Sequence, residues 1–532
     1  MKKDKNEIIV KIPLGTVGMK LASVLPVLGH SISMPCGGNG TCGKCRVKVL
    51  KGKLTDKNGV PLIPDENGTV PACKAYCSKE CTHIAIRNPV GRGLELPTED
   101  AGNDGPFGIA LDIGTTTIAA AKVNLKTRKI AATASCLNPQ AAFGADVISR
   151  ITAASAGHLN ELQSSVTKAV RELLEKLLPG FGSDAEAPPD MTVAGNATML
   201  HLFAGISPEG MGRYPFTPAF RDARVIPGKE LGLPVNGITL LPSISAFDGG
   251  DITAGMYSLE FGRSDAPKLL LDIGTNAEMV LDIGSEKRPA EGPGRLLATS
   301  AAAGPAFEGA NISCGTGGVA GAVCSVRAID GHLIYRTVGN APANGICGSG
   351  LLDFTAFLLR SGLLEKDGRL RLFGAPAVLS GSHDTSPELR IYPQGGLAKP
   401  EAVPSVMLTQ GDIRQIQLAK SAIYAGTETL LAAADYTPES FIAAGGRVFI
   451  AGGFGFYMNP ENAAVIGMIP ECFKYRTETV GNTALKGAVA ALCDENALSI
   501  MKELSESASA INLEDYEVFA KGFIEHTVFP AT

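Results

Sequence analysis

The chain alternates between segments with strand-like and helix-like patterns of apolar residues. Residues 7–13 (EIIVKIP) and 44–52 (KCRVKVLKG) alternate between apolar and polar positions, which predicts two half-buried strands. The apolar runs at residues 109–113 and 191–195 have the length and content of buried strands. In the segment 160–178 the apolar residues recur at helical spacing, which predicts an amphipathic helix packed on a core. This mixture of patterns predicts an α/β fold.

A motif that reads GIALDIGTTT from Gly108 contains one of these buried strands. Its acid, Asp112, stands at the end of the strand, where it can hold the metal that accompanies a phosphate, or a water bound to that metal. A glycine permits the tight turn that follows, and the backbone N–H groups and hydroxyls of threonines form a concave anion site. The residues expected to cradle a phosphate are Gly114, Thr115, Thr116 and Thr117. Taken alone, the motif is equally typical of a buried strand and its turn.

The same motif occurs a second time, as LLLDIGTNAE from Leu269. Asp272 takes the place of the first acid. The corresponding turn residues are Gly274, Thr275 and Asn276. Glu278, two residues further on, is a candidate for orienting water or completing a metal shell, and a capping or surface role is the alternative. Two copies of one phosphate loop indicate two related halves that close over one nucleotide.

Further glycine-rich turns follow the second copy. Gly304 lies in AAAGPAFEGA, and Gly348 and Ser349 lie in GICGSGLLD, where small residues open helices and let a nucleotide approach the backbone. A strand at residues 448–451 runs into a glycine loop that fits the adenosine of a nucleotide. The residues of that loop are Gly452, Gly453 and Gly455.

Two patterns predict the elements of the last part of the chain. The sequence Thr409-Gln-Gly-Asp412 is a capping box, which predicts a helix that extends to about Ala433. Residues 364–405 are irregular and proline-rich, which predicts a surface excursion. The segment after Ser505 is acidic and is expected to be a featureless tail.

Cysteines give the second chemical clue. Half of the 12 cysteines fall within residues 36–81, and the N-terminus has no apolar core of a signal peptide, so metal ligation is favoured over disulfides. Cys36, Cys42 and Cys45 form a Cys-x5-Cys-x2-Cys loop rich in glycine, whose N–H groups can hydrogen-bond to sulfur. Cys73 is the best candidate for a fourth ligand. Zinc is the alternative metal, but it typically uses two Cys-x2-Cys pairs, and only one is present. Cys77 and Cys81 remain as free thiols, substitute ligands or a second site.

Composition limits the function classes. With 532 residues, 45% of them hydrophobic, the chain is long enough for about three or four domains with sizeable cores. Its net charge of −5 and the lack of a basic block argue against nucleic-acid binding. No apolar stretch is long enough to span a bilayer, so a soluble, cytoplasmic protein without membrane contact is expected.

The order of these motifs resembles known families. Two phosphate loops followed by an adenosine loop resemble the superfamily of acetate and sugar kinases, Hsp70 and actin, over about residues 107–500. The cysteine loop resembles that of a 2Fe-2S ferredoxin of the plant or adrenodoxin type, with five residues instead of four in the first gap. Together the two parts resemble the reductive activators of corrinoid proteins. The motifs that carry this resemblance are CGGNGTCGKC, LDIGTTT, DVISRI, LDIGTNAEM, AAAGPAFEGA, GICGSGLLD, AKSAIYAG and IAGGFG.

The resemblance implies a fold and a domain order. It implies an N-terminal β-grasp, ferredoxin-like 2Fe-2S domain and a two-lobed actin/Hsp70-like ATPase core with duplicated mixed-sheet halves. The expected divisions are a 2Fe-2S domain at 1–90, a linker at 91–106, a first lobe at 107–265, a second lobe at 266–502 with its surface insertion near 364–405, and a C-terminal tail at 503–532. Because the first phosphate loop follows the linker almost directly, we expect a compact form that lacks the extra middle domain of larger members.

The resemblance also implies a function. It implies ATP-dependent, one-electron reduction of inactive Co(II) to Co(I) in a corrinoid methyltransferase system, with a 2Fe-2S cluster, ATP and Mg2+ as cofactors. Asp112 and Asp272 would organise Mg2+ and water, and both turns would cradle phosphates. A corrinoid protein as electron acceptor, a low-potential ferredoxin or reductase as donor, and a homodimer are the implied partners.

Three other functions are compatible with parts of the sequence. A redox ATPase that activates another low-potential metalloenzyme is one, as in activators of 2-hydroxyacyl-CoA dehydratases, but those bind a 4Fe-4S cluster between subunits. A small-molecule kinase needs a substrate pocket and a general base that the motifs do not supply. A plain electron carrier with an ATPase-like scaffold needs neither the aspartates nor the paired glycine loops.

Overall fold

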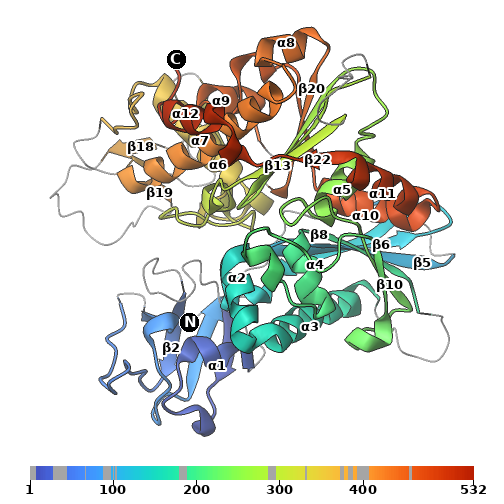
Figure 1. The fold of residues 1–532 in the computed structure, drawn as a ribbon. Helices are drawn as coiled ribbons and strands as arrows, with labels where there is room; N and C mark the ends of the chain where they lie inside the picture. The colour runs from blue at the N-terminus through green and yellow to red at the C-terminus, as the bar shows by residue number, and fades with distance from the viewer. Residues whose placement is uncertain are drawn as a thin grey trace.

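The chain folds into three units that follow one another in sequence (Figure 1). The computed structural model describes residues 7–27, 45–65, 68–87, 98–99, 101, 105–178, 188–285, 295–329, 332–371, 377–380, 388–391, 406–453 and 458–531. A small N-terminal domain precedes two larger lobes, each built on its own six-stranded sheet. Within these ranges, no helix is long and apolar enough to cross a membrane.

The N-terminal domain is a four-stranded antiparallel sheet with one helix packed on it. Its strands lie in the order β1-β4-β2-β3. Its elements are β1 (Glu7–Lys11), α1 (Leu21–Val27), β2 (Arg46–Lys51), β3 (Thr69–Pro71) and β4 (His83–Arg87). Leu21 and Leu25 of α1 join Val47 and Ile84 of the sheet in a closed core. The strands predicted at 7–13 and 44–52 are therefore confirmed as β1 and β2.

The first lobe contains the first phosphate motif. Its sheet has the order β7-β6-β5-β8-β10-β9, in which β5, β8 and β10 are parallel and the hairpin strands β6 and β7 are antiparallel to their neighbours. Its strands are β5 (Phe107–Ile113), β6 (Thr117–Asn124), β7 (Lys129–Leu137), β8 (Met191–Gly195), β9 (Arg224–Pro227) and β10 (Gly237–Leu240). Its helices are η3 (Pro139–Ala142), α2 (Val147–Ala153), η4 (Ala154–His158), α3 (Leu159–Leu177), α4 (Ala197–Ala204), η5 (Glu209–Gly212) and η6 (Gly228–Leu231). The amphipathic helix predicted at 160–178 is α3, whose apolar face joins the core of this lobe.

The second lobe repeats this topology. Its sheet has the order β21-β20-β11-β12-β13-β22, so the series β13-β12-β11-β20-β21 matches β7-β6-β5-β8-β10 strand for strand. Its main strands are β11 (Lys268–Ile273), β12 (Ala277–Asp282), β13 (Leu296–Ala301), β20 (Arg447–Ala451), β21 (Thr477–Gly481) and β22 (Ala508–Ala510). The prediction of duplicated mixed-sheet halves is confirmed by this common strand order.

The remaining elements of the second lobe cover its sheet and extend away from it. Its helices are η7 (Pro305–Glu308), α6 (Gly348–Arg360), α7 (Gln410–Ala432), α8 (Pro438–Ala443) and α9 (Pro460–Val465). Two small sheets contain β14 (Ala322–Ile329), β15 (His332–Thr337) and β16 (Gly345–Ile346), and β17 (Ala377–Ser380), β18 (Glu388–Ile391) and β19 (Val406–Leu408). The predicted capping box is present, because the side chains of Thr409 and Asp412 each accept a bond from the other residue's backbone N–H at the start of α7.

Two helices pack between the lobes. The helix α5 (Gly250–Ser258) places Ala254 in a core with the sheet of the first lobe, whereas its Ile252 and Met256 pack on the sheet of the second lobe. The helix α10 (Thr483–Cys493) follows strand β21 of the second lobe, yet its Leu485 packs on the sheet of the first lobe. A Cβ added to Gly487 of α10 would lie 2.2 Å from a carbonyl oxygen of α5, so a glycine is required where the helices cross. Figure 1 shows α5 and α10 between the lobes.

The last thirty residues differ from the featureless tail that we expected. They include the end of α11 (Ala497–Ser507), strand β22, which extends the sheet of the second lobe, and α12 (Glu517–Glu525), which packs on α7. Lys420 of α7 is buried and donates to the carbonyl oxygens of His526 and Val528. Phe529 is also buried. The acidic composition of this segment reflects its exposed face and gave no indication of this anchoring.

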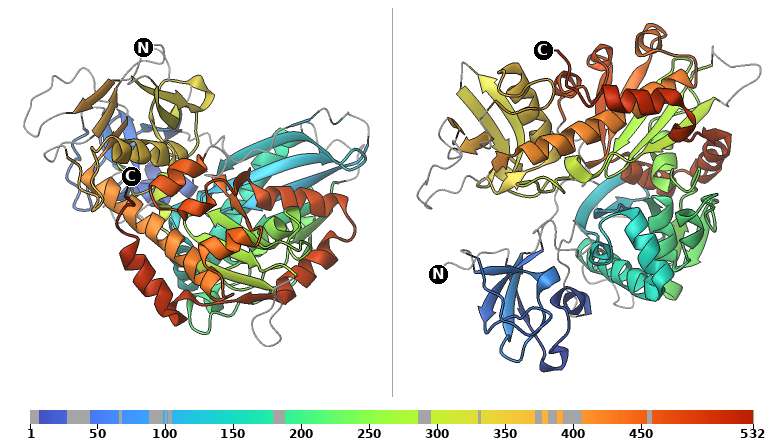
Figure 2. Two further views of the ribbon diagram at one scale, coloured as in Figure 1. Left: turned by 90° about the horizontal axis from the view of Figure 1, so that it is seen from above. Right: turned by 60° about the vertical axis from the view of Figure 1, so that its left-hand side comes forward.

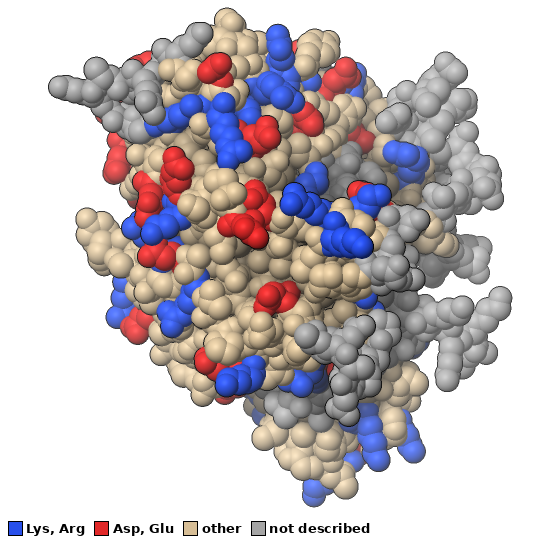
Figure 3. All heavy atoms as spheres, turned by 90° about the vertical axis from the view of Figure 1, so that its right-hand side faces the viewer, with Lys and Arg blue, Asp and Glu red and all other residues tan. Residues whose placement is uncertain are grey.

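Charged side chains of both signs are interspersed over the face of the molecule shown in Figure 3. No extended basic stripe is visible on that face, in agreement with the net charge of −5.

Candidate functional site

The first phosphate turn joins β5 to β6, and its backbone is fixed by two side chains from behind. The amide of Gly114 donates to the carbonyl of Thr117 across the turn. Asn138 donates from its side chain to the carbonyl of Gly114, at 2.8 Å, and from its backbone to that of Thr116, also at 2.8 Å. The buried Arg150 donates to the remaining carbonyl, that of Thr115, at 2.6 Å. Because N–H and C=O point in opposite directions in a trans peptide, the amides of Thr115 and Thr116 face away from these two side chains.

The second phosphate turn joins β11 to β12 in the same way. The amide of Gly274 donates to the carbonyl of Asn276 at 2.9 Å, which closes the turn. Asp272, the last acid of β11, lies opposite Glu278 of β12 in the strand register. The hairpin therefore brings two of the three predicted catalytic acids to adjacent positions.

Glu308 connects the two turns. It ends the short helix η7, and its Oε2 accepts hydrogen bonds from the hydroxyl of Thr116 at 2.8 Å and from that of Thr275 at 2.6 Å. Thr116 belongs to the first lobe and Thr275 to the second. The two phosphate turns thus lie within the reach of one carboxylate where the lobes meet, a region that we call the interlobe cleft.

Two further contacts complete the cleft. Asn482 caps the start of α10 by accepting from the amide of Leu485, and its side-chain NH2 donates to Asp112 at 2.8 Å. On the other side, a Cβ added to Gly452 would lie 2.8 Å from Oδ1 of Asp272. The predicted adenosine loop therefore begins in direct contact with the acid of the second turn.

Acidic side chains converge at the floor of this cleft. Burial, together with the nearby charges of Asp251, Asp112 and Glu308, raises the pKa of Asp272 to about 8. Burial likewise raises the pKa of Asp112 to about 7, although the hydrogen bond from Asn482 opposes the shift. The pKa of Glu278 is also raised well above its ordinary value, by burial and by the charges of Asp251, Asp272 and Asp248. Such a group of carboxylates repels itself unless protons or a cation neutralise it.

Asp248 belongs to the same group of acids. Asp248 accepts a bond from Ser245 through Oδ2, but its Oδ1 is buried without a hydrogen-bond partner among the described residues. Burial raises the pKa of Asp248 to about 7. Within the described ranges, no three acidic, histidine or cysteine side chains already stand as a metal cage. This arrangement fits Mg2+, which is usually held by one or two carboxylates together with waters and substrate phosphates.

The other residues predicted to bind the nucleotide lie in different surroundings. A Cβ added to Gly304 would meet nothing within 4 Å, so its backbone borders open space. Ser349 lies in the first turn of α6, is 3% exposed and donates its hydroxyl to the carbonyl of Cys324, so this hydroxyl is not available to a phosphate. Gly348 starts the same helix, and Gly453 follows Gly452 at the exposed end of β20. Gly455 lies outside the described residues.

Of the four cysteines predicted to bind the cluster, the structure describes two. Cys45 and Cys73 are both buried, and the backbone N–H of Cys73 donates to Sγ of Cys45 at 3.4 Å. An N–H···S contact is typical of the surroundings of an iron–sulfur cluster, so these two residues fit as neighbouring ligands. Cys36 and Cys42 lie outside the described residues. Burial raises the pKa of Cys81 to about 11 and also raises that of Cys77.

Sequence reasoning missed several residues of the cleft as site residues. Asp248 and Asp251 lie in a conspicuous DGGD motif at the start of α5, and Glu308 lies in AAAGPAFEGA, so their motifs were visible but their roles were not. Asn482 follows a strand of the second lobe, and only the crossing of α10 brings it to Asp112. Arg150 belongs to DVISRI, a motif whose position behind the turn is a tertiary feature.

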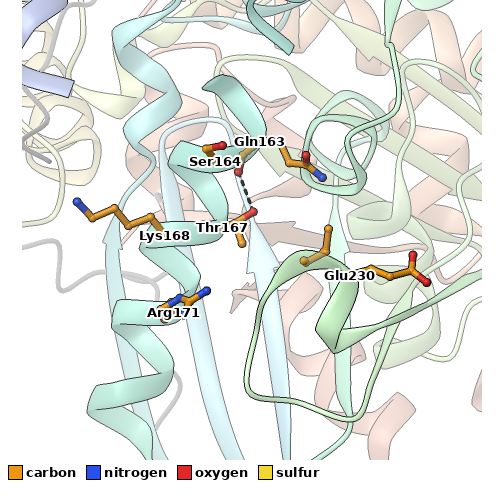
Figure 4. Close-up of a pocket in the computed structure, with 7 residues that line it drawn as sticks. Gln163, Ser164, Thr167, Lys168, Arg171 and Glu230 are labelled. Carbon is orange, nitrogen blue, oxygen red and sulfur yellow. Dashed lines mark hydrogen bonds between the residues drawn. The ribbon is translucent and has the colours of Figure 1, made fainter. Parts of the chain in front are cut away.

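A separate surface hollow of about 280 Å3 lies between α3 and η6 (Figure 4). Its lining residues are Gln163, Ser164, Thr167, Lys168, Arg171, Glu230 and Leu231. Thr167 is occupied by a hydrogen bond to the carbonyl of Gln163, and Arg171 donates to the carbonyl of Gly232. None of the predicted site residues lines this hollow, and we assign it no role.

Three family models match consecutive parts of the chain. A 2Fe-2S iron–sulfur cluster binding domain matches residues 16–78, the RACo middle region matches residues 107–264, and the C-terminal domain of RACo, the ASKHA domain, matches residues 266–532. Together they cover the N-terminal domain and both lobes.

Individual relatives agree with these matches. The chain is 30% identical over 437 residues to the corrinoid activation enzyme RamQ of Eubacterium limosum, which covers 80% of this chain and 70% of the relative. It is 26% identical over 443 residues to the [Co(II) methylated amine-specific corrinoid protein] reductase of Methanosarcina barkeri, covering 76% and 74% of the two chains. Among solved structures, a reductive activator for corrinoid, iron–sulfur protein matches with a TM-score of 0.68 and 29% identity, over 98% of this chain and 96% of the other.

Proposed function

Because the chain belongs to the family of reductive activators of corrinoid proteins, we propose that it performs ATP-dependent, one-electron reduction of a corrinoid protein from Co(II) to Co(I). The observation that carries this proposal is the interlobe cleft, in which two phosphate turns face each other over a group of acids. A cysteine-bearing domain of the 2Fe-2S type precedes this cleft in the same chain. A nucleotide site and a one-electron carrier in one chain are the two parts that such a reaction needs.

Family membership also corrects one expectation. We expected a compact chain without the middle domain of larger members, but residues 107–264 match the family's middle region. That region is the first lobe itself, with its own sheet and phosphate turn. The family's middle region is therefore present in this chain.

In the cleft, we assign Asp112 and Asp272 to the binding of Mg2+ and its waters. The unpartnered oxygen of Asp248 and the raised pKa values of the acids support this assignment, because a divalent cation stabilises the charged carboxylates. Glu278 adjoins Asp272 and is suited to orienting a water molecule. The outward-facing amides of the first turn and Thr275 of the second would bind the phosphates, and Gly452 would leave room for the nucleotide beside Asp272.

In the N-terminal domain, we assign Cys36, Cys42, Cys45 and Cys73 as the ligands of the 2Fe-2S cluster. The contact between the Cys73 amide and the Cys45 sulfur supports the second pair. A cluster bound there supplies single electrons at low potential. The surrounding core excludes water from Cys45 and Cys73, and the amide of Cys73 stabilises negative charge on sulfur.

The energy of ATP serves to compensate for an unfavourable potential. In a one-electron reaction each tenfold change in the equilibrium constant corresponds to about 59 mV, so a donor whose potential is too high by 120 mV leaves about one Co(I) in a hundred. Nucleotide binding and hydrolysis, by closing and opening the two lobes, would shift this equilibrium in the complex with the corrinoid protein. A ferredoxin or reductase as donor and a homodimeric assembly remain predictions that rest on the resemblance alone.

The alternative is activation of a different low-potential metalloenzyme. The test offers the reduced protein, with MgATP, either a Co(II) corrinoid protein or the iron–sulfur component of a 2-hydroxyacyl-CoA dehydratase. We expect electron transfer to the corrinoid protein only, measured by its Co(I) absorbance. Transfer to the dehydratase component alone would contradict the proposal and favour the alternative.

A further inference from the structure

The segment from Asn138 to Arg150 touches both the nucleotide site and the N-terminal domain. Its first residue, Asn138, holds two carbonyl oxygens of the first phosphate turn, and its last, Arg150, holds the third. Between them, Ala142 at the end of η3 packs against the hydrophobic core of the N-terminal domain, where η3 lies against α1. In Figures 1 and 2 the N-terminal domain lies beside this side of the first lobe.

We propose that η3 couples the nucleotide state of the cleft to the conformation of the iron–sulfur domain. Asn138 and Arg150 are the positioning residues that connect η3 to the phosphate turn. The inference rests on the proposed function for the meaning of the two sites. The contacts on which it depends belong to the chain itself.

Buried hydrogen bonds fix η3 to the phosphate turn and to α3. Asn138 is 1% exposed, and its side-chain oxygen accepts a hydrogen bond from the amide of Gln140. The first turn of η3 is therefore bonded to the same residue that donates to the phosphate turn. Gln140 is fully buried and donates to the carbonyl of Leu162 in α3. A shift of the phosphate turn on nucleotide binding must therefore move η3 or break buried hydrogen bonds, which are costly to leave unmade.

Arg150, at the opposite end of the segment, also donates a hydrogen bond to the phosphate turn. Its guanidinium donates to Thr115 and to the carbonyl of Gly144, and it also contacts the sulfur of Met199. Burial lowers the pKa of Arg150 to about 10, while the nearby charges of Asp146 and Glu308 oppose the shift, so it stays charged at neutral pH. The phosphate turn, Asn138 and Arg150 form one hydrogen-bonded unit.

In the N-terminal domain, η3 contacts α1, the helix that precedes two of the assigned cluster ligands in the sequence. The helix α1 buries Leu21 and Leu25 in the core to which Ala142 adds its methyl group. In the sequence, α1 is followed by residues 28–44, which include Cys36 and Cys42. A movement of η3 would thus act on the helix that precedes two of the assigned cluster ligands. Coupling between distant sites needs such a contiguous set of packed and hydrogen-bonded groups.

The test measures hydrogen–deuterium exchange of the α1 amides in the full chain, with and without Mg2+ and a non-hydrolysable ATP analogue. We expect nucleotide to change the exchange of residues 21–25 in the wild type. In Ala142→Asp, which places a charge in the η3–α1 contact, we expect the nucleotide affinity to be retained and the α1 response to be lost. The matched control is Ala156→Asp, an exposed position of the same lobe, in which the response should persist.

Three outcomes would overturn the inference: no α1 response in the wild type, a full response in Ala142→Asp, or loss of the response in Ala156→Asp as well. Should Ala142→Asp fail to fold, Asn138→Asp tests the contact between η3 and the phosphate turn. This change removes the donor to Gly114 while keeping the acceptor for Gln140, and it should abolish the α1 response even at saturating nucleotide. Because no corrinoid protein is present, a failure here is distinct from a failure of the proposed function.

Discussion

Thr116 and Thr275 lie in opposite lobes and donate to the same carboxylate oxygen of Glu308, at 2.8 and 2.6 Å. This shared carboxylate holds the two phosphate turns close together. Glu308 is therefore placed to stabilise the arrangement in which both lobes can contact one nucleotide.

Removing this carboxylate should uncouple the lobes. Hydrogen bonds to a charged group contribute about 1.5–3 kcal/mol each, so losing one in the closed state corresponds to about a 10- to 100-fold effect. We expect Glu308→Ala to lower the rate of ATP hydrolysis by about this factor.

Glu439→Ala, at an exposed position of α8, is the control and should leave hydrolysis unchanged. In a double-mutant cycle, Thr116→Val and Thr275→Val should be non-additive, because their hydroxyls share one acceptor. Wild-type hydrolysis by Glu308→Ala would show that the bridge is incidental.

The acids of the cleft predict a pH-dependent stability in the absence of nucleotide. Because the pKa of Asp272 is raised from 3.8 to about 8, the folded chain retains a proton that the unfolded chain releases. The corresponding stabilisation is complete below pH 4 and is lost as the pH rises through 8, with a slope of at most about 1.4 kcal/mol per pH unit for one group.

Thermal unfolding should therefore show a midpoint that falls between pH 6 and pH 8.5, and Asp272→Asn should make this decline shallower. Mg2+ with nucleotide should reverse it, since a cation favours the charged carboxylate. A midpoint that rises with pH over this range would contradict the arrangement of acids described above.

The contact between Gly452 and Asp272 predicts a strong effect of a single methyl group. Gly452 has a φ of 91°, and a Cβ there would come within 2.7 Å of the carbonyl of Ile273 and 2.8 Å of Asp272 Oδ1. We expect Gly452→Ala to weaken nucleotide binding at least tenfold, measured by calorimetry, because the acid is displaced.

Gly317→Ala is the matched control, since a Cβ at this exposed glycine meets nothing within 4 Å. It should bind nucleotide as the wild type does. Equal affinities of both variants would place the nucleotide away from β20.

The buried cysteines of the N-terminal domain predict different roles for neighbours in sequence. Cys73 adjoins the sulfur of Cys45, whereas burial raises the pKa of Cys81 to about 11, which keeps it a neutral thiol at physiological pH. We expect Cys73→Ser to abolish the visible absorbance of a reconstituted 2Fe-2S cluster and Cys81→Ser to retain it. The reverse result would assign the fourth ligand to Cys81.

Local patterns predicted the fold and the two phosphate turns because both are encoded within a few residues. LDIGTTT and LDIGTNA each lie at the turn between two paired neighbouring strands, and the capping box at Thr409 starts α7 as expected.

The rest of the site depends on contacts between distant segments. Asn482 reaches Asp112 only because α10 packs on the first lobe, and Glu308 bridges turns that lie far from it in sequence. The prediction of a featureless tail was wrong for a similar reason, since β22 and α12 are specified by their partners in β13 and α7. No local pattern contains that information.

The central claim is that nucleotide turnover in the cleft drives an electron onto cobalt. The most direct measurement mixes the reduced protein with a Co(II) corrinoid protein and follows the Co(I) absorbance with and without MgATP. We predict Co(I) only with MgATP, and its loss in both Asp272→Ala and Cys42→Ala. Equal formation of Co(I) without ATP, or none despite an intact 2Fe-2S spectrum and ATP hydrolysis, would contradict this account.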